Sequence, residues 1–326
     1  MADDVRALVV REPGGPDVLE VQTRPMPEPD AGELVVEVAA SGVNFKDVYQ
    51  REGIYPVTTP FVLGSECAGT VTAVGPGVVD VSVGDHVATA SGAGTHASHA
   101  VVAESAAVPV ADGVALDVAA AAMLQGMTAH YLVNSTYPLR AGEVALVHAA
   151  AGGVGQLLVQ LAKAKGARVV ATVGSAAKVD VATAAGADDV IRYDDVDDLA
   201  AAVREIVPEG VDVAYDGVGK ATFEASLGSL RRRGLLALFG AASGQVPPFD
   251  LQRLNPAGSL FVTRPTLDHY VADRDELLWR SGDLFRAIAS GELRVEISGR
   301  YGLDEAGQAY RDLEGRATTG KLLIVP

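Results

Sequence analysis

Cysteine is almost absent from this chain, since Cys67 is the only one among 326 residues. A lone cysteine excludes any disulfide scaffold within the chain and is typical of a reducing compartment. Long apolar runs are also missing, because no stretch approaches the ~20 apolar residues that span a bilayer. The N-terminus carries Asp3 and Asp4 and no apolar run, so we expect no signal peptide and a cytoplasmic protein without membrane contact.

Basic residues are scarce, with 26 lysines and arginines against 42 acidic residues and a net charge of −16. This balance argues against a nucleic-acid-binding surface. The only tight basic cluster is Arg231–Arg233, just before an apolar run. We expect it to form the charged C-terminal end of a helix.

The richest signal is the stretch 143–155, Glu-Val-Ala-Leu-Val-His-Ala-Ala-Ala-Gly-Gly-Val-Gly. Val144–Val147 predicts a buried strand, and the apolar period from Val154 onward predicts a helix packed on one face. The turn between them has the spacing Ala150-x-Gly152-x-x-Gly155, a dinucleotide fingerprint whose first glycine is alanine. A strand, a small-residue turn and a helix start form a pyrophosphate site. The simpler alternative is a helix packed closely on a sheet.

Regular alternation of apolar strands and helices continues around this stretch. It predicts a doubly wound parallel Rossmann sheet of order 3-2-1-4-5-6. The six predicted strands are Val144–Val147, Arg168–Val173, Asp189–Tyr193, Val211–Tyr215, Leu235–Phe239 and Ser259–Val262.

The first 124 residues differ, with short β-rich runs separated by proline and glycine clusters, which is typical of a compact β-barrel. The segment after Pro265 combines helices with two β-like runs, and we expect it to complete this first domain. The predicted domains are therefore residues 1–124 with 267–326, and an inserted cofactor domain at 125–266.

Several motifs now resemble one family, the zinc-free quinone oxidoreductase (zeta-crystallin-like) branch of the medium-chain dehydrogenase/reductase superfamily. They fall in that family's order along nearly the whole chain, as Gly42–Asp47, Gly64–Gly69, Val83–Val87, Ala149–Gly155 and Val262–Pro265. The resemblance implies a GroES-like catalytic domain split around a Rossmann domain, an NADPH cofactor, a quinone substrate and a homodimer.

Zinc-dependent relatives carry cysteine where this chain has Asn44 and histidine where it has Ser65, and the loop of four structural cysteines is missing. We therefore expect no metal. His96 and His99 are three residues apart on a predicted strand, where they would face opposite sides, so packing or surface roles are favoured over metal binding.

The resemblance also assigns residues to the nicotinamide and substrate site. They are Asn44, Tyr49, Tyr55 and Arg264, with Thr128 near the nicotinamide ribose or amide. Asn and Arg suit hydrogen bonding to a developing oxyanion, and tyrosines suit the walls of an aromatic site. The alternatives are core tyrosines at 49 and 55 and an ion-paired surface arginine at 264.

For the rest of the cofactor, the turn residues Gly152, Gly153, Val154 and Gly155 are predicted to bind the pyrophosphate. After the second strand the chain reads Gly174-Ser175-Ala-Ala-Lys178, without the acid that NAD-specific domains place there. This predicts NADPH, with Ser175 and Lys178 near the 2′-phosphate, although Lys178 could also lie on a solvated helix face. The resemblance adds Tyr193, Phe239 and Gly240 to the cofactor site.

The predicted function is therefore an NADPH-dependent quinone reductase that transfers hydride without a metal. Two alternatives stay open: an NADPH-dependent reductase of activated C=C bonds, such as enones or 2-alkenals, and a non-catalytic NADPH-binding protein. A hydrolase is disfavoured, because the chain has no Gly-x-Ser-x-Gly elbow and Cys67 has no evident histidine partner.

Overall fold

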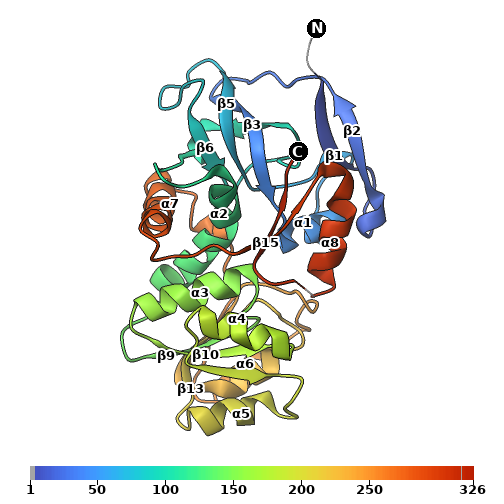
Figure 1. Ribbon diagram of the computed structural model, residues 1–326. Coiled ribbons are helices and arrows are strands. Elements are labelled where there is room, and N and C mark those ends of the chain that lie inside the picture. The colour runs from blue at the N-terminus through green and yellow to red at the C-terminus, as the bar shows by residue number, and fades with distance from the viewer. Residues whose placement is uncertain (1–3, 317) are drawn as a thin grey trace. The chain divides into compact units, whose positions relative to one another are not determined.

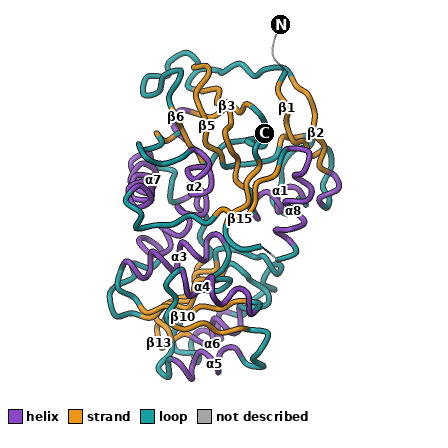
Figure 2. The backbone as a smooth tube through the Cα atoms, viewed as in Figure 1, coloured by secondary structure: helices purple, strands orange, loops and turns teal. Residues whose placement is uncertain are grey.

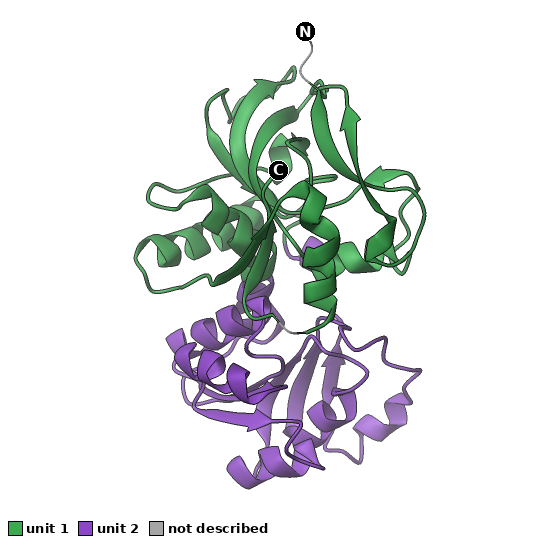
Figure 3. Ribbon diagram, turned by 45° about the vertical axis from the view of Figure 1, so that its right-hand side comes forward, with its two compact units in different colours: residues 1–127, 271–326 green, residues 128–270 purple. Residues whose placement is uncertain are grey.

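The structure is a computed structural model that describes residues 4–316 and 318–326. The chain divides into two compact units, coloured separately in Figure 3, which comprise residues 4–127 with 271–326 and residues 128–270. Figures 1 and 2 show the helices and strands of each unit. No helix within the described ranges combines the length and apolarity needed to cross a membrane.

The second unit contains a six-stranded sheet in the order β11-β10-β9-β12-β13-β14. All its pairings are parallel. In chain order this is 3-2-1-4-5-6, so the predicted Rossmann topology is confirmed. The strands are β9 Val144–Val147, β10 Arg168–Val173, β11 Asp189–Arg192, β12 Val211–Asp216, β13 Leu230–Leu238 and β14 Phe261–Thr263.

Helices cover both faces of this sheet, with α3 and α4 on one side and α5 and α6 on the other (Figure 1). Their bounds are α3 Gly153–Ala164, α4 Val179–Ala184, α5 Leu199–Ile206 and α6 Phe223–Ser229. Strands covered on both faces need apolar side chains on both, which explains their continuous apolar runs. Leu146, Val170, Ala214 and Leu236 are fully buried in one core.

The first unit has a three-stranded sheet, β2-β1-β4, and a seven-stranded sheet in which β7 also pairs with β3 along the path β15-β16-β3-β5-β6-β8. Its strands are β1 Val5–Val10, β2 Leu19–Arg24, β3 Glu33–Gly42, β4 Phe61–Val62, β5 Cys67–Val74, β6 His86–Thr89, β7 His99–Ala103, β8 Val108–Pro109, β15 Ile297–Tyr301 and β16 Lys321–Ile324. Its helices are α1 Phe45–Arg51, α7 Arg274–Ala289 and α8 Ala306–Glu314. β16 pairs antiparallel with β3, so the last strand completes the sheet of the first unit, as the sequence suggested.

Helix α2, Leu116–Tyr131, begins in the first unit and ends in the second. It is followed by a π-helical turn, Leu132–Thr136. The second passage of the chain between the units lies at residues 270–271.

Two local expectations were wrong. Arg231–Arg233 does not end a helix: α6 stops at Ser229, and the arginines lie in β13, which starts at Leu230. The last strand of the sheet is Phe261–Thr263 rather than Ser259–Val262. Ser259 has φ 54°, a left-handed conformation outside the extended region of regular strands.

Candidate active site

The turn between β9 and α3 has the geometry of an anion site. Helix α3 starts at Gly153, with Gly152 as its N-cap and no acidic residue in its first turn. The first N–H groups of any helix lack an acceptor within the helix and carry partial positive charge. The turn is closed by a hydrogen bond from Gly152 N to the Ala149 carbonyl, at 2.9 Å.

Gly155 shows how tightly this turn is built. A Cβ placed on Gly155 would lie 2.4 Å from the Ala149 carbonyl oxygen and 2.7 Å from Ala150 Cα. Both are backbone atoms, so no side-chain rotation could relieve the clash. The glycine therefore brings the helix start against the turn, as the close helix–strand packing of a dinucleotide fingerprint requires. These residues fit the pyrophosphate of a bound dinucleotide.

A buried polar network underlies the turn. His148 Nδ1 contacts Thr172 Oγ1 at 2.8 Å and Nε2 contacts Ser226 Oγ at 3.0 Å. Ser226 in turn donates to Asp216 Oδ2 at 2.8 Å. Burial lowers the pKa of His148, so its imidazole is neutral at physiological pH. The network ties β9, β10, β12 and α6 together below the turn, and it was not predicted from the sequence.

The end of β10 brings together the residues predicted for the adenosine phosphate. A Cβ on Gly174 would lie 2.3 Å from the Tyr193 hydroxyl oxygen, so this hydroxyl sits directly against the glycine. Ser175 caps a short 3₁₀ turn that ends at Lys178. The two nearby acids, Asp194 and Asp195, are paired with Arg192 at 2.8 and 2.7 Å, which offsets their charge.

Predicted residues of the cofactor site and of the substrate site lie at the ends of β13 and β14, respectively. A Cβ on Gly240 would lie 2.4 Å from the Gly217 carbonyl oxygen, so the chain after β13 packs backbone to backbone on the chain after β12. Arg264 follows β14, and its Nη1 donates to the Leu238 carbonyl at 2.9 Å. All these segments leave the carboxyl edge of the parallel sheet, where ligands of doubly wound folds bind.

In the first unit, the predicted residues gather on α1 and the loop after it. Asn44 is the N-cap of α1, within a capping box formed with Asp47. Tyr49 and Tyr55 meet edge to face, with ring centroids 5.2 Å apart and planes at 64°. Tyr49 is 9% exposed and Tyr55 is 39% exposed, so the inner ring supports the outer one.

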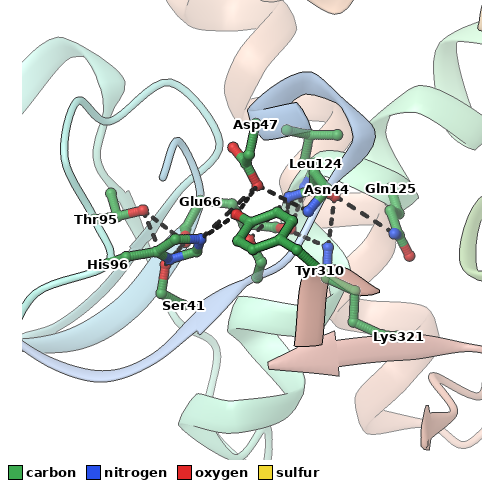
Figure 4. A network of polar contacts seen from close by, with 11 residues as sticks. Ser41, Asn44, Asp47, Glu66, Thr95, His96, Leu124, Gln125, Tyr310 and Lys321 are labelled. Atoms are coloured by element: carbon green, nitrogen blue, oxygen red, sulfur yellow. Dashed lines mark hydrogen bonds and ion pairs between the residues drawn. The ribbon is translucent and has the colours of Figure 1, made fainter. Parts of the chain in front are cut away.

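Asn44 belongs to a buried polar network drawn in Figure 4. Lys321 Nζ lies 2.7 Å from Asn44 Oδ1 and 2.6 Å from Glu66 Oε2. Asn44 Nδ2 donates to Glu66 Oε2 at 2.8 Å and to the Gly42 carbonyl at 3.1 Å. Gln125 Nε2 approaches Asn44 Oδ1 at 3.4 Å. Both amide hydrogens of Asn44 are thus engaged inside the protein.

The same network continues to His96 (Figure 4). Asp47 Oδ2 contacts the Tyr310 hydroxyl at 3.1 Å, and that hydroxyl contacts His96 Nε2 at 2.7 Å. His96 Nδ1 lies 2.7 Å from Ser41 Oγ. Burial raises the pKa of Asp47 to about 7 and lowers that of His96 to about 3. His96 is therefore neutral and packed in the core.

These residues do not suit a zinc ion. Asn44 and Glu66 already share their lone pairs with the ammonium of Lys321. Burial, followed by the charge of Glu66, raises the pKa of Cys67 to about 12, so its thiol stays protonated and is a poor metal ligand. In the described part of the chain, no three His, Cys, Asp or Glu side chains are grouped as a metal site.

The charged members of this network, Glu66, Asp47 and Lys321, were not predicted from the sequence. One signal was available. Lys321 directly precedes the apolar run Leu322–Ile324 and begins β16, and a lysine at the start of a fully buried strand needs a buried partner.

Both units of the chain match known protein families. Residues 30–135 match the family described as Alcohol dehydrogenase GroES-like domain, and residues 153–271 match Zinc-binding dehydrogenase. The chain is 46% identical to a quinone oxidoreductase of Salmonella typhimurium over 319 residues, which cover 96% of this chain and 97% of that protein.

Two further relatives bear on the chemistry. The crystal structure of Escherichia coli quinone oxidoreductase complexed with NADPH has 41% identity and a TM-score of 0.96, and the match covers 98% of this chain and 100% of that one. A 2-haloacrylate reductase of Burkholderia sp is 38% identical, with 99% of both chains covered. Identity of this extent over nearly whole chains shows the family. The chain belongs to the zinc-free, zeta-crystallin-like quinone oxidoreductase branch of the medium-chain dehydrogenase/reductase superfamily.

Proposed function

We propose that the protein is an NADPH-dependent quinone reductase that works without a metal. The observation that carries this proposal is the Gly155 turn, whose backbone leaves no room for a side chain and fits a pyrophosphate. Its near-full-length similarity to a quinone oxidoreductase crystallised with NADPH supports the same cofactor and substrate class.

In this proposal the second unit holds the cofactor. The N–H groups of Gly153, Val154 and Gly155 bind the pyrophosphate, together with the N-terminal charge of α3. Ser175, Lys178 and Tyr193 bind the adenosine 2′-phosphate. The remaining contacts, with the nicotinamide half, come from Thr128, Phe239 and Gly240. When bound, NADPH supplies the hydride.

The chain's own residues then bind and orient the acceptor. Tyr49 and Tyr55 offer flat aromatic surfaces for a quinone ring. Arg264 supplies N–H donors for the oxygen that gains negative charge. Because a hydroquinone anion takes its proton from water, no general acid is required.

We also propose the domain boundaries of the sequence prediction. They are 1–124 with 267–326 for the catalytic domain and 125–266 for the cofactor domain. We further propose a cytoplasmic location for the protein.

A second candidate is reduction of an activated C=C bond, which the similarity to 2-haloacrylate reductase favours. Initial rates of NADPH oxidation against matched quinones and enones decide between the two. Quinone turnover well above enone turnover supports the proposal, and the reverse order selects the alternative. No turnover with either class would point to a non-catalytic NADPH-binding protein.

Cofactor choice gives a direct test of Lys178. We expect Lys178→Ala to raise the NADPH KM by roughly 10-fold or more, because one charge-assisted contact contributes ~1.5–3 kcal/mol. The NADH KM should hardly change, since NADH has no 2′-phosphate. Lys165→Ala, at the far end of α3, is the matched control. Equal effects on both cofactors would remove Lys178 from the phosphate site.

We also propose a homodimer built on strand β14. This strand is the edge of the Rossmann sheet, and Phe261 on it is 59% exposed. An exposed apolar edge favours pairing with a symmetry-related copy. Light scattering at micromolar concentration should give twice the 33.5 kDa of one chain. Phe261→Asp should yield monomers, whereas Leu251→Asp, at a residue 69% exposed elsewhere on this unit, should not. A wild-type monomer would contradict the proposal.

Metal independence is tested by chelation. Prolonged treatment with a strong chelator should leave the rate of quinone reduction unchanged, because no residue set in the described structure suits zinc. If the purified protein contained stoichiometric zinc, and the chelator removed both the zinc and the activity, the reaction would depend on a metal.

A further inference from the structure

Lys321 is a buried ammonium at the start of β16. The residue is 1% exposed, and its partner Glu66 is 0% exposed. Removing both charges from water is strongly unfavourable unless the pair is well aligned and fully hydrogen-bonded. Here Glu66 Oε2 lies 2.6 Å from Nζ, and its other oxygen accepts from the backbone N–H of Leu124. The pair is therefore fixed from two sides.

The backbone of the first unit makes room for this pair. β3 lies between β16 and β5, with Gly42 opposite Leu323 and Ser41 opposite Cys67. A Cβ on Gly42 would lie 2.0 Å from Glu66 Oε2 and 2.8 Å from Lys321 Cε. Because Gly42 has no side chain, the ammonium of Lys321 and the carboxylate of Glu66 have the space to meet beside it.

The ammonium also determines the orientation of the Asn44 carboxamide. Lysine can only donate, so the atom 2.7 Å from Nζ must be the oxygen Oδ1. Nδ2 then points to Glu66 and to the Gly42 carbonyl, which use both of its hydrogens. A flipped amide would place an N–H group against the ammonium and an oxygen against the carboxylate. Lys321 and Glu66 together therefore permit one orientation.

Stability alone does not account for such a pair, because buried ion pairs in proteins can often be replaced by well-packed apolar residues without loss. We propose that Lys321 is a positioning residue for the reaction. Its ammonium clamps Asn44 and with it the start of α1, the helix that carries Tyr49 and leads to Tyr55. This inference rests on the proposed function, since it assigns those tyrosines to the acceptor site.

The first test is Lys321→Met, which keeps the length of the side chain and removes the charge. We expect kcat with a quinone to fall by about 10-fold or more, since small misplacements of a site carry such losses. The NADPH KM should change by about 2-fold or less, because the phosphates bind to the turn after β9. Gly42→Ala, which forces the pair apart, should give the same pattern.

Arg280→Met is the matched control. Arg280 is also a fully buried cation of the first unit, 2.8 Å from Glu276 on α7. We expect Arg280→Met to lower the melting temperature without changing kcat with a quinone or the NADPH KM. An equal loss of kcat in Arg280→Met would assign the effect of Lys321→Met to general destabilisation and overturn the proposal.

The double variant Glu66→Gln with Lys321→Met separates positioning from stability. It removes the unpaired carboxylate that Lys321→Met leaves buried, so its melting temperature should recover toward that of the wild type. Its kcat should stay low, because a glutamine amide and Asn44 can pair in either orientation. Parallel recovery of melting temperature and kcat would mean that Lys321 acts on stability only, which contradicts the proposal.

A readout without turnover keeps this inference separate from the proposed function. The side-chain amide protons of Asn44 should exchange slowly with solvent in the wild type by NMR. In Lys321→Met they should exchange at least about 10-fold faster, while backbone amides of β3 stay protected. If the wild type reduces neither quinones nor enones, the proposed function fails, yet this exchange still tests the clamp. Unchanged Asn44 exchange in the variant would overturn it.

Discussion

Gly155→Ala is expected to abolish useful NADPH binding while leaving a folded protein. The added Cβ would lie 2.4 Å from the Ala149 carbonyl oxygen and 2.9 Å from the Ala150 carbonyl carbon, distances that real Cβ atoms do not reach. The turn must therefore move away from the start of α3. Overpacking of this kind costs about 1–3 kcal/mol of stability.

The larger effect falls on the cofactor, because the displaced N–H groups no longer converge on the pyrophosphate. Losing two charge-assisted hydrogen bonds of ~1.5–3 kcal/mol each raises the NADPH KM by roughly 100-fold or more. Steady-state kinetics and fluorescence titration with NADPH measure this. NADH binding should weaken equally, since the pyrophosphate is common to both cofactors.

Gly282→Ala provides the control for this substitution. Gly282 lies in α7, and a Cβ there would meet no atom within 4 Å. Alanine is the better helix former by up to about 1 kcal/mol, so the protein should become slightly more stable with unchanged NADPH binding. A wild-type NADPH KM in Gly155→Ala would exclude the turn as the pyrophosphate site.

The turn and the sheet order could be predicted from sequence because their signals are local. A β-branched run, a run of five small residues at 149–153 and a 3.6-residue apolar period lie within one short stretch around Gly152. The position of Arg231–Arg233 could not be predicted in the same way. Helix α6 and strand β13 follow each other without a loop, so no turn signal separates them.

The charged network around Asn44 could not be predicted from the sequence, for a different reason. Lys321 and Asn44 are 277 positions apart in the chain, and nothing local to either residue indicates the other. The residue types also predict the wrong environment, because lysine and glutamate are almost never fully buried unless paired and are therefore expected on the surface. Their meeting depends on β16 returning to β3, which only the sheet topology reveals.

Asp47→Asn is expected to change how stability depends on pH. Asp47 is fully buried, its Oδ1 has no hydrogen-bond partner among the described residues, and burial raises its pKa from 3.8 to about 7. The contacts with Asn44 N, Lys321 and Tyr310 lower the pKa and offset only part of this effect.

Both hydrogen bonds to Asp47 reach the same carboxylate oxygen: the Asn44 N–H and the Tyr310 hydroxyl donate to Oδ2, at 2.8 and 3.1 Å. His96 lies on the other side of Tyr310, with Nε2 2.7 Å from the Tyr310 hydroxyl and Nδ1 2.7 Å from Ser41 Oγ. Two donors on one oxygen do not compensate for the burial of a carboxylate whose other oxygen has no partner among the described residues.

The sign follows from proton binding in the two states. Between pH 3.8 and about 7 the folded protein holds a proton on Asp47 that the unfolded chain has lost. The free energy of unfolding therefore falls as pH rises through this window, by up to about 4 kcal/mol in total. His96 has the opposite effect, because its pKa is lowered from 6.5 to about 3, so its contribution increases stability as pH rises between those values. The two contributions overlap and largely cancel in the wild type.

Asp47→Asn removes the pH-dependent contribution of Asp47 to the free energy of unfolding and leaves the contribution of His96. Asparagine has nearly the same shape, stays neutral at every pH and can still accept from Asn44 N. Urea unfolding at pH 4.5, 5.5, 6.5 and 8 should therefore show a variant that gains stability relative to the wild type as pH rises, most steeply below about pH 7. The difference should level off above pH 7, where Asp47 of the wild type is already ionised. A difference that is constant across this range would mean that Asp47 is ionised throughout, and that the buried network holds a second negative charge beside Glu66.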